Sequence, residues 1–224
     1  MNSAFKIPHK PKPHFFVDVD RVLIDFPKMR DGWNERFTKR LGAETLERFK
    51  EFYDAHKASW QGTYESLVDQ FFIEHADPAD VQHVRSIFFD IDYRQFYLPR
   101  VIETLKMLHK IGGITIFTQG FTDLQGAKVQ PLIDDGVVGA AAICIAKQKT
   151  DVIGACLADT GTHQPVVPVV IDDYVEVLEA FRHYAPSAIG VLVYGNHPEQ
   201  QALIGNAEFP QIVIEQLQDI GRFV

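Results

Sequence analysis

Short apolar runs that alternate with helix-like segments constrain the fold of this 224-residue chain more than any other feature. The runs have the length of buried strands, and they lie at residues 15–19, 114–117, 140–145, 166–171 and 189–194. Segments with helical spacing of apolar residues separate most of them, for example residues 174–183. Strands that alternate with helices imply a parallel sheet covered on both faces. We therefore predict an α/β fold with a doubly wound, Rossmann-like parallel sheet.

The segment between the first strand and Pro99 has a different character. Its apolar residues recur at helical spacing, as at Trp33, Phe37 and Leu41, and nothing in it predicts a strand. The spacing predicts about four helices there, inserted into the sheet domain. We predict three parts of the chain. Residues 1–14 form a flexible leader, residues 15–26 and 99–224 form the sheet domain, and residues 27–98 form the helical insertion.

The overall charge excludes some classes of partner. A net charge of −8 and an isoelectric point near 5.5 do not attract nucleic acid or anionic lipid by bulk electrostatics. No apolar run approaches the roughly 20 residues that span a bilayer. Cys144 and Cys156 form neither a zinc motif nor a disulfide framework, so we expect a reducing, cytoplasmic location.

Polar residues end three of the predicted strands, where a buried strand would not need them. In an open parallel sheet, ligands bind beyond the carboxyl ends of the strands, where the strand order reverses. The fourth strand ends at Asp172 and Asp173. If these strands are neighbours, the residues that meet there are Asp18, Asp20, Thr118 and Asp172, and Lys149 after the third strand could reach them. We predict that they line one crevice.

The chemistry of these side chains points to phosphoryl transfer. Several carboxylates held close together stay ionised only if a cation neutralises them, and an all-oxygen set suits Mg²⁺. Lys149 adds a second positive charge. Thr118 offers a hydroxyl, and the N–H groups of Gln119 and Gly120 lie at a turn where an anion can approach the backbone. Together these parts make a phosphoryl-transfer site.

Four motifs in order resemble those of the haloacid dehalogenase (HAD) superfamily. The first is residues 18–23, Asp-Val-Asp-Arg-Val-Leu, after an apolar strand. The second is the strand 114–120 that ends in a threonine, and the third is Lys149 before a helix. The fourth is the strand 169–173, which ends in paired acids. The helical insertion lies where that superfamily places its helical cap, between the first and second motifs.

The resemblance implies a role for each matching residue. Asp18 would be the nucleophile that forms an aspartyl-phosphate, and Asp20 would act as general acid and then general base. The backbone carbonyl of Asp20 would also contact Mg²⁺. Asp172 would bind the metal, with Asp173 or Glu176 as a further ligand or an outer partner. The metal set is therefore Asp18, Asp20, Asp172 and Asp173.

Substrate binding is assigned by the same resemblance. Thr118 and Lys149 would hold the phosphoryl oxygens, beside Gln119 and Gly120. Lys147 is the rival lysine, and we prefer Lys149 because Thr150 and Asp151 can start the helix that should follow it.

Two residues depart from the commonest pattern of the superfamily. Arg21 and Ile171 stand where glycine is frequent. Arg21 is a further substrate-binding candidate, either as an extra anion contact in the crevice or directed along the cap hinge. Both positions vary in the superfamily, so neither substitution implies a dead site.

The activity that follows is Mg²⁺-dependent hydrolysis of a small phosphomonoester. We expect the substrate to be a small phosphorylated metabolite and the protein to be a monomer or a homodimer. An inserted cap restricts access to the crevice, which favours a small substrate over a protein. A phosphomutase, a dehalogenase of the same superfamily and a non-catalytic HAD-like binding protein are the alternatives. Asp20 argues against the dehalogenase, because that reaction has no alkoxide to protonate.

Overall fold

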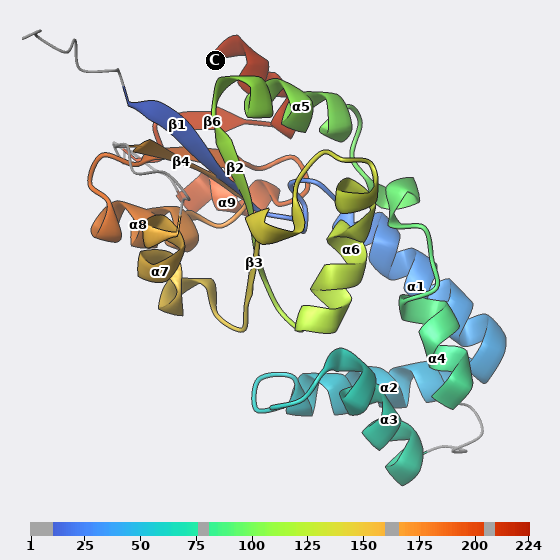
Figure 1. The fold of residues 1–224 in the computed structure, drawn as a ribbon. Helices are drawn as coiled ribbons and strands as arrows, with labels where there is room; N and C mark the ends of the chain where they lie inside the picture. Colours follow the sequence, from blue (N-terminus) through green and yellow to red (C-terminus); the bar gives the residue numbers. More distant parts are fainter. Residues whose placement is uncertain (1–10, 76–80, 160–165, 204–208) are drawn as a thin grey trace, which may run out of the picture.

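A six-stranded parallel sheet forms the centre of the protein (Figure 1), and the predicted fold class is confirmed. The computed structural model describes residues 11–75, 81–159, 166–203 and 209–224. The strand order is β3-β2-β1-β4-β5-β6, so the order reverses at β1. The strands are β1 (Lys12–Val17), β2 (Gly113–Gln119), β3 (Ile143–Ala146), β4 (Val166–Asp172), β5 (Ile189–Val193) and β6 (Ile212–Ile214).

Helices cover both faces of the sheet because successive strand residues point to opposite sides. Phe15 packs with one group of helices and Phe16 with the other. Phe15 lies on the side of α5 (Val101–Ile111), α6 (Thr122–Asp134) and the 3₁₀ helix η5 (Leu217–Arg222). Phe16 lies on the side of α7 (Ile153–Ala158) and α8 (Val175–Tyr184). Three short elements complete this part of the fold: η3 (Ala140–Ala142), η4 (Lys149–Asp151) and α9 (Pro198–Leu203).

Of the five α-helices that the described residues form between β1 and β2, the first four make up what we call the helical lobe (Figure 1). They are α1 (Phe26–Leu41), α2 (Ala43–His56), α3 (Tyr64–His75) and α4 (Val81–Phe88), followed by the 3₁₀ helix η2 (Tyr93–Phe96). Asp25 caps α1, because its Oδ1 accepts from the N–H of Lys28 at 3.1 Å. The lobe has its own buried aromatic core, in which Phe37 stacks on Phe49. The sequence predicted these helices, while the division of the chain into domains stays a prediction.

The helical lobe contacts the sheet part of the protein at several points. Asp123 of α6 accepts from the N–H groups of Tyr64 and Glu65, at 2.9 Å each, and so caps the start of α3 from the other side of the boundary. Lys147, after β3, donates to the carbonyl of Trp60 at 2.9 Å. These bonds hold the lobe to the segments that follow β2 and β3, beyond the carboxyl ends of those strands.

The structure differs from the prediction at both ends of the chain. β1 begins at Lys12, so residues 12–14 belong to the sheet rather than to the predicted leader, because β2 and β4 on either side pair with His14. Residues 1–10 of that leader lie outside the described residues. β6 was not predicted, since its three residues, Ile212–Ile214, are too few for a clear apolar run. Residues 140–142 form a 3₁₀ turn rather than the start of β3.

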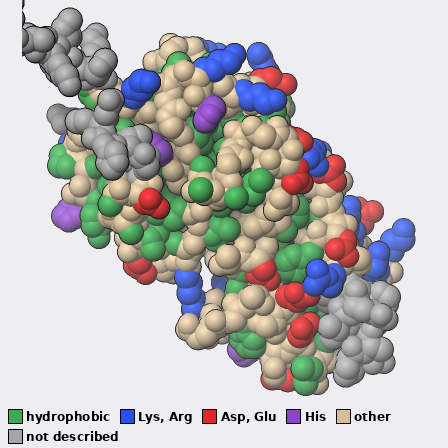
Figure 2. All heavy atoms as spheres, viewed as in Figure 1, with side chains coloured by type: hydrophobic (Ala, Val, Ile, Leu, Met, Phe, Trp, Pro, Cys, Tyr) green, Lys and Arg blue, Asp and Glu red, His purple; other side chains and the backbone are tan. Residues whose placement is uncertain are grey.

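The surface and the helices show two further features. Acidic and basic side chains are mixed along the face seen in Figure 2, rather than separated by sign. Within the described part of the chain, no helix combines the length and the apolar character that crossing a membrane requires.

Candidate active site

The register of the sheet brings the first and fourth motifs together. Val17 pairs with Ile171, and the N–H of Asp18 continues the ladder by donating to the Ile171 carbonyl at 3.0 Å. Asp172 comes directly after Ile171, so it lies beside Asp18 at the carboxyl edge of the sheet. β2 pairs with β1 on the other side, which places Thr118 at the same edge. The predicted convergence of these strand ends is therefore observed.

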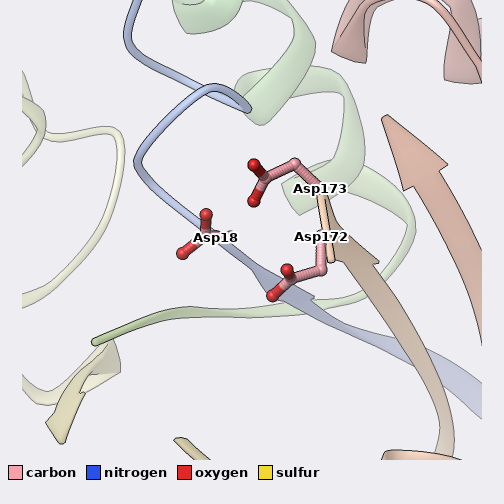
Figure 3. A group of neighbouring side chains, drawn as sticks. All are labelled: Asp18, Asp172 and Asp173. Carbon is pink, nitrogen blue, oxygen red and sulfur yellow. The ribbon is translucent and has the colours of Figure 1, made fainter. Parts of the chain in front are cut away.

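Three buried carboxylates form a compact group at this edge (Figure 3). Asp18, Asp172 and Asp173 each offer an oxygen, and these oxygens lie within 4.8 Å of one another. Lys149 inserts its ammonium group between two of the acids, with Nζ 2.5 Å from Oδ1 of Asp18 and 2.6 Å from Oδ2 of Asp172. The side chain of Asp172 is fixed further, because its Oδ1 accepts from the N–H of Tyr174 at 2.9 Å.

The electrostatics of the group reflect burial and crowding. Burial, opposed by Lys149 and reinforced by Asp172, raises the pKa of Asp18 to about 7. Burial and the carboxylates of Asp18 and Asp172 raise the pKa of Asp173 to about 9. Burial by itself would lower the pKa of Lys149, but the carboxylates of Asp172 and Asp18 raise it above its ordinary value. Burial thus disfavours the ionised forms of Asp18 and Asp173, and Lys149 only partly offsets this for Asp18.

This donor set fits a divalent cation. Burial and neighbouring carboxylates raise the pKa of Asp18 and Asp173, and a bound cation would favour the ionised forms of both. All three candidate ligands are oxygens, which suits Mg²⁺ better than a softer metal. Asp18, Asp172 and Asp173 are the residues that would hold it. The side chain of Asp20 lies outside this group, and Glu176 is exposed on α8.

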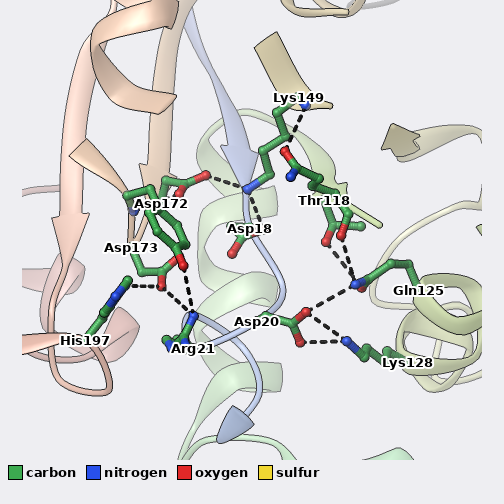
Figure 4. Close-up of polar contacts among 12 residues, drawn as sticks. Asp18, Asp20, Arg21, Thr118, Gln125, Lys128, Lys149, Asp172, Asp173 and His197 are labelled. Carbon is green, nitrogen blue, oxygen red and sulfur yellow. Dashed lines mark hydrogen bonds and ion pairs between the residues drawn. The ribbon is translucent and has the colours of Figure 1, made fainter. Parts of the chain in front are cut away.

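Two residues on the far side of the group hold Asp173 (Figure 4). His197 bonds through Nδ1 to Oδ2 of Asp173 at 2.8 Å, and its other nitrogen lies 2.9 Å from Oε1 of Glu199. Arg21 lies 3.5 Å from the same Asp173 oxygen. Burial and the nearby charge of Arg21 lower the pKa of His197. His197 therefore holds the carboxylate of Asp173 in place through a hydrogen bond.

Arg21 adopts a backbone conformation that favours glycine. Its φ of 67° lies in the left-handed region, which accounts physically for the frequency of glycine at the matching position of the HAD motif. The guanidinium lies 4.9 Å above the centre of the Phe26 ring and 3.4 Å from the hydroxyl of Tyr174. Arg21 thus pairs with Asp173 and packs on Phe26, the first residue of α1, while its role as a contact for a substrate anion stays a prediction.

Asp20 belongs to a second charged pair, separate from the three acids. Lys128 of α6 donates to both of its carboxylate oxygens at 2.8 Å, and Gln125 donates to Oδ2 at 3.1 Å. Gln125 in turn accepts from the hydroxyl of Thr118 at 3.3 Å. Figure 4 shows Asp20 on the α6 side of Asp18, with this chain of bonds leading to Thr118.

The second motif is only in part where it was predicted. Thr118 is buried at the strand end, and the Gln119 side chain accepts from the N–H of Lys149 at 3.1 Å. We predicted that the N–H of Gly120 faces an anion, and this prediction is wrong. It donates instead to the carbonyl of Ala146 at 2.9 Å, because the hydrogen bonding between β2 and β3 continues to this residue.

The two candidate lysines are separated clearly. Lys149 is buried among the acids, whereas Lys147 is exposed and contacts the helical lobe. The preference for Lys149 over Lys147 as the lysine next to the acids therefore agrees with the structure.

Sequence reasoning missed Gln125, Lys128 and His197. Their burial is what sets them apart, and burial of a polar residue cannot be read from a single sequence. One signal was present: Gln125 and Lys128 are three residues apart on the helix that follows the second motif, so they share a face of it.

Comparison with known proteins agrees with the fold. No protein-family model matches the chain, and no curated protein matches it in a sequence search. Solved structures do match. A protein from Burkholderia xenovorans LB400 described as haloacid dehalogenase-like is 18% identical, with a TM-score of 0.77 over 95% of this chain and 96% of that chain.

Two further structures illustrate the range of these neighbours. YfnB from Bacillus subtilis, described as a HAD-hydrolase and bound to magnesium, is 13% identical, with a TM-score of 0.58 over 96% of this chain and 99% of that one. A 2-haloacid dehalogenase from Pseudomonas syringae is 14% identical, with a TM-score of 0.59 over 96% of this chain and 100% of that one. The resemblance to the HAD superfamily is confirmed as a fold, with the helical lobe included in the match.

Proposed function

We propose that the protein is a Mg²⁺-dependent phosphatase that hydrolyses a small phosphomonoester through a phosphoryl group carried on Asp18. The observation that carries this proposal is the pairing of Lys149 with both Asp18 and Asp172 inside a buried group of three acids. A nucleophilic carboxylate, a fixed cation and an oxygen-only metal set are the parts that phosphoryl transfer requires. The magnesium in the YfnB structure gives further support.

The reaction divides into two balanced displacements. In the first, a carboxylate oxygen of Asp18 bonds to phosphorus, the ester P–O bond breaks, and the proton on Asp20 passes to the leaving oxygen. In the second, water bonds to phosphorus, its proton returns to Asp20, and the P–O bond to Asp18 breaks. The products are an alcohol and inorganic phosphate, and Asp18 and Asp20 are regenerated.

Positive charge around the phosphoryl group comes from several sources. Lys149 lies beside Asp18, where it would stabilise the charge on the transferred oxygens. The Thr118 hydroxyl can turn from Gln125 to an oxygen of the substrate. Mg²⁺ bound by Asp18, Asp172 and Asp173 would supply further positive charge for the phosphoryl oxygens. Arg21, which lies beside Asp173 with its side chain 24% exposed, is our candidate for binding an anionic group elsewhere on the substrate.

Asp20 favours a phosphatase over a dehalogenase. Displacement of a halide from carbon gives a leaving group that needs no proton, whereas an alkoxide needs one. The structural neighbours include a haloacid dehalogenase, so the experiment has to separate the two reactions. A phosphomutase would share the phosphorylated Asp18 and is distinguished only by its product.

The test is an assay of three substrates with the purified protein. Hydrolysis of an aryl phosphate in the presence of Mg²⁺, lost when a chelator removes the metal and restored by added Mg²⁺, is the expected result. Chloride release from a 2-chloroalkanoate without phosphate release would contradict the proposal and favour a dehalogenase. Conversion of a sugar phosphate into its isomer would favour a phosphomutase. Absence of all three reactions would favour a binding protein.

A further inference from the structure

Lys128 is buried, and its ammonium group binds the carboxylate of Asp20. Its side chain is 2% exposed, whereas the side chain of Asp20, its partner, is 22% exposed. Nζ lies 2.8 Å from each oxygen of Asp20, so the contact is symmetrical. Burying a lysine is costly unless its ammonium group has hydrogen-bond partners, and the two oxygens of Asp20 supply them. Of the two partners, Asp20 is therefore the one that solvent or a substrate can reach.

Gln125 holds the same carboxylate from the preceding turn of α6. Its Nε2 donates to Oδ2 of Asp20 at 3.1 Å and to the carbonyl of Gln119 at 3.0 Å. Its Oε1 accepts from Thr118, which fixes which way the amide is turned. Gly120 leaves the space for this side chain, because a Cβ there would lie 3.1 Å from Nε2. The position of Asp20 is therefore tied to the second motif.

The helical lobe closes the remaining side of Lys128. The rings of Phe26 and Trp33, both on α1, have their centres 5.7 Å from Nζ. These contacts combine a favourable cation–π geometry with a wall that limits the movement of the lysine. The backbone of Lys128 is fixed as well, because its carbonyl accepts from the hydroxyl of Tyr97 at 3.0 Å.

A general acid acts efficiently only when it is held within reach of the leaving oxygen. The three acids that fit a metal do not include the side chain of Asp20, so those metal ligands cannot orient it. We propose that Lys128 and Gln125 are positioning residues that hold Asp20 for proton transfer to the leaving group. This inference rests on the proposed phosphatase function, and it assigns Lys128 a role distinct from binding the phosphoryl group.

The leaving group separates this role from the alternatives. An alkyl phosphate releases a strongly basic alkoxide, which needs the proton from Asp20. A nitrophenyl phosphate releases a stable phenolate, which leaves without one. Loss of a residue that aligns Asp20 therefore lowers kcat for the alkyl phosphate much more than for the nitrophenyl phosphate. A fold defect or a lost phosphate contact lowers the activity on both esters alike.

The experiment measures kcat and KM for both esters, with Mg²⁺, in wild type, Lys128→Met, Lys128→Arg and Asp20→Asn. We expect Lys128→Met to lower kcat for the alkyl ester by about 100-fold, the lower range for a lost general acid, with a much smaller effect on the nitrophenyl ester. Asp20→Asn should show the same bias. Lys128→Arg, which keeps the charge, should retain most of the activity. Lys106→Met removes an exposed lysine of α5 and is the matched control.

Equal losses with both esters in Lys128→Met, or a change confined to KM, would overturn the inference while leaving the phosphatase proposal intact. Lys128→Met with unchanged kcat for the alkyl ester would do the same. A wild-type protein that hydrolyses neither ester would overturn the phosphatase proposal and this inference with it. If Lys128→Met does not fold, Gln125→Met provides the test, and it should show the same bias toward loss with the alkyl ester.

Discussion

The ammonium group of Lys149 lies 2.5 Å from Oδ1 of Asp18, although 131 positions separate the two residues in the chain. Parallel pairing of neighbouring strands produces this contact, because the carboxyl ends of β1 and β4 finish side by side and β3 finishes at the same edge of the sheet. Lys149 completes the contact by reaching Asp172 as well. The proposed chemistry depends on this one bridging cation.

Replacing Lys149 should damage catalysis far more than replacing its neighbour in the sequence. Lys149→Ala removes the charge between Asp18 and Asp172, so we expect kcat to fall by at least about 100-fold, as when one preorganised stabilising group is lost. Lys147→Ala removes only a contact to the Trp60 carbonyl. Steady-state kinetics on an aryl phosphate make the comparison, and a larger loss in Lys147→Ala would refute the assignment.

His197 should tune the affinity for Mg²⁺ without contacting it. Because His197 holds Asp173 at 2.8 Å, His197→Ala is expected to raise the Mg²⁺ concentration for half-maximal activity by about tenfold, the usual scale for a lost outer partner. A magnesium titration of the activity measures this. His183→Ala, at an exposed histidine of α8, is the control and should leave the titration unchanged. An identical titration in His197→Ala would show that Asp173 needs no such support.

The left-handed backbone at Arg21 has a measurable cost. Arg21→Gly and Arg21→Ala both remove the guanidinium, but only glycine accepts a φ of 67° without strain. We expect Arg21→Gly to be more stable to unfolding than Arg21→Ala by about 1 kcal/mol. Urea denaturation of the two variants gives this difference directly. Equal stability would mean that the backbone relaxes around the alanine.

His14 should make the stability of the fold depend on pH. Burial lowers its pKa from the ordinary value of 6.5, and Nδ1 is buried with no hydrogen-bond partner among the described residues. The folded state therefore binds the proton less well than the unfolded state does. The stabilisation from neutral His14 is complete above pH 6.5, and it is lost as the pH falls from there toward the lowered folded value.

Comparison of variants isolates this effect of His14 from other titrations. Between about pH 7 and about pH 5, the range in which histidine titrates, the free energy of unfolding should fall more in wild type than in His14→Gln. His109→Gln, at an exposed histidine of α5, should behave like wild type. Parallel curves for wild type and His14→Gln would contradict the expectation.

Much of the fold and of the acid cluster could be predicted from the sequence. The strand before Asp18 and those that carry Thr118 and Asp172 are short apolar runs followed by polar residues, and such strands have few other arrangements than a covered parallel sheet. The motif order then placed Lys149 among the acids. These predictions depend on local pattern and on the topology of parallel sheets, and both can be read from one chain.

The parts that escaped prediction depend on side-chain packing. Lys128 is polar and lies in a helix, so from sequence it resembles any exposed lysine, and only the packing of α6 against α1 buries it. His197 reaches Asp173 from the segment after β5, for which no structure was predicted. Gly120 was misjudged because β3 extends to Ala146, one residue beyond the predicted end of that strand, and the Ala146 carbonyl accepts from Gly120.

Trapping the phosphorylated protein is the most direct test of the central claim that Asp18 is a nucleophile. The protein is mixed with an aryl phosphate and Mg²⁺, quenched with acid during turnover, and digested for mass spectrometry. The account predicts a phosphoryl group on the peptide that contains Asp18, and neither this adduct nor turnover in Asp18→Asn. Turnover in the wild type without that adduct, or full activity in Asp18→Asn, would contradict it.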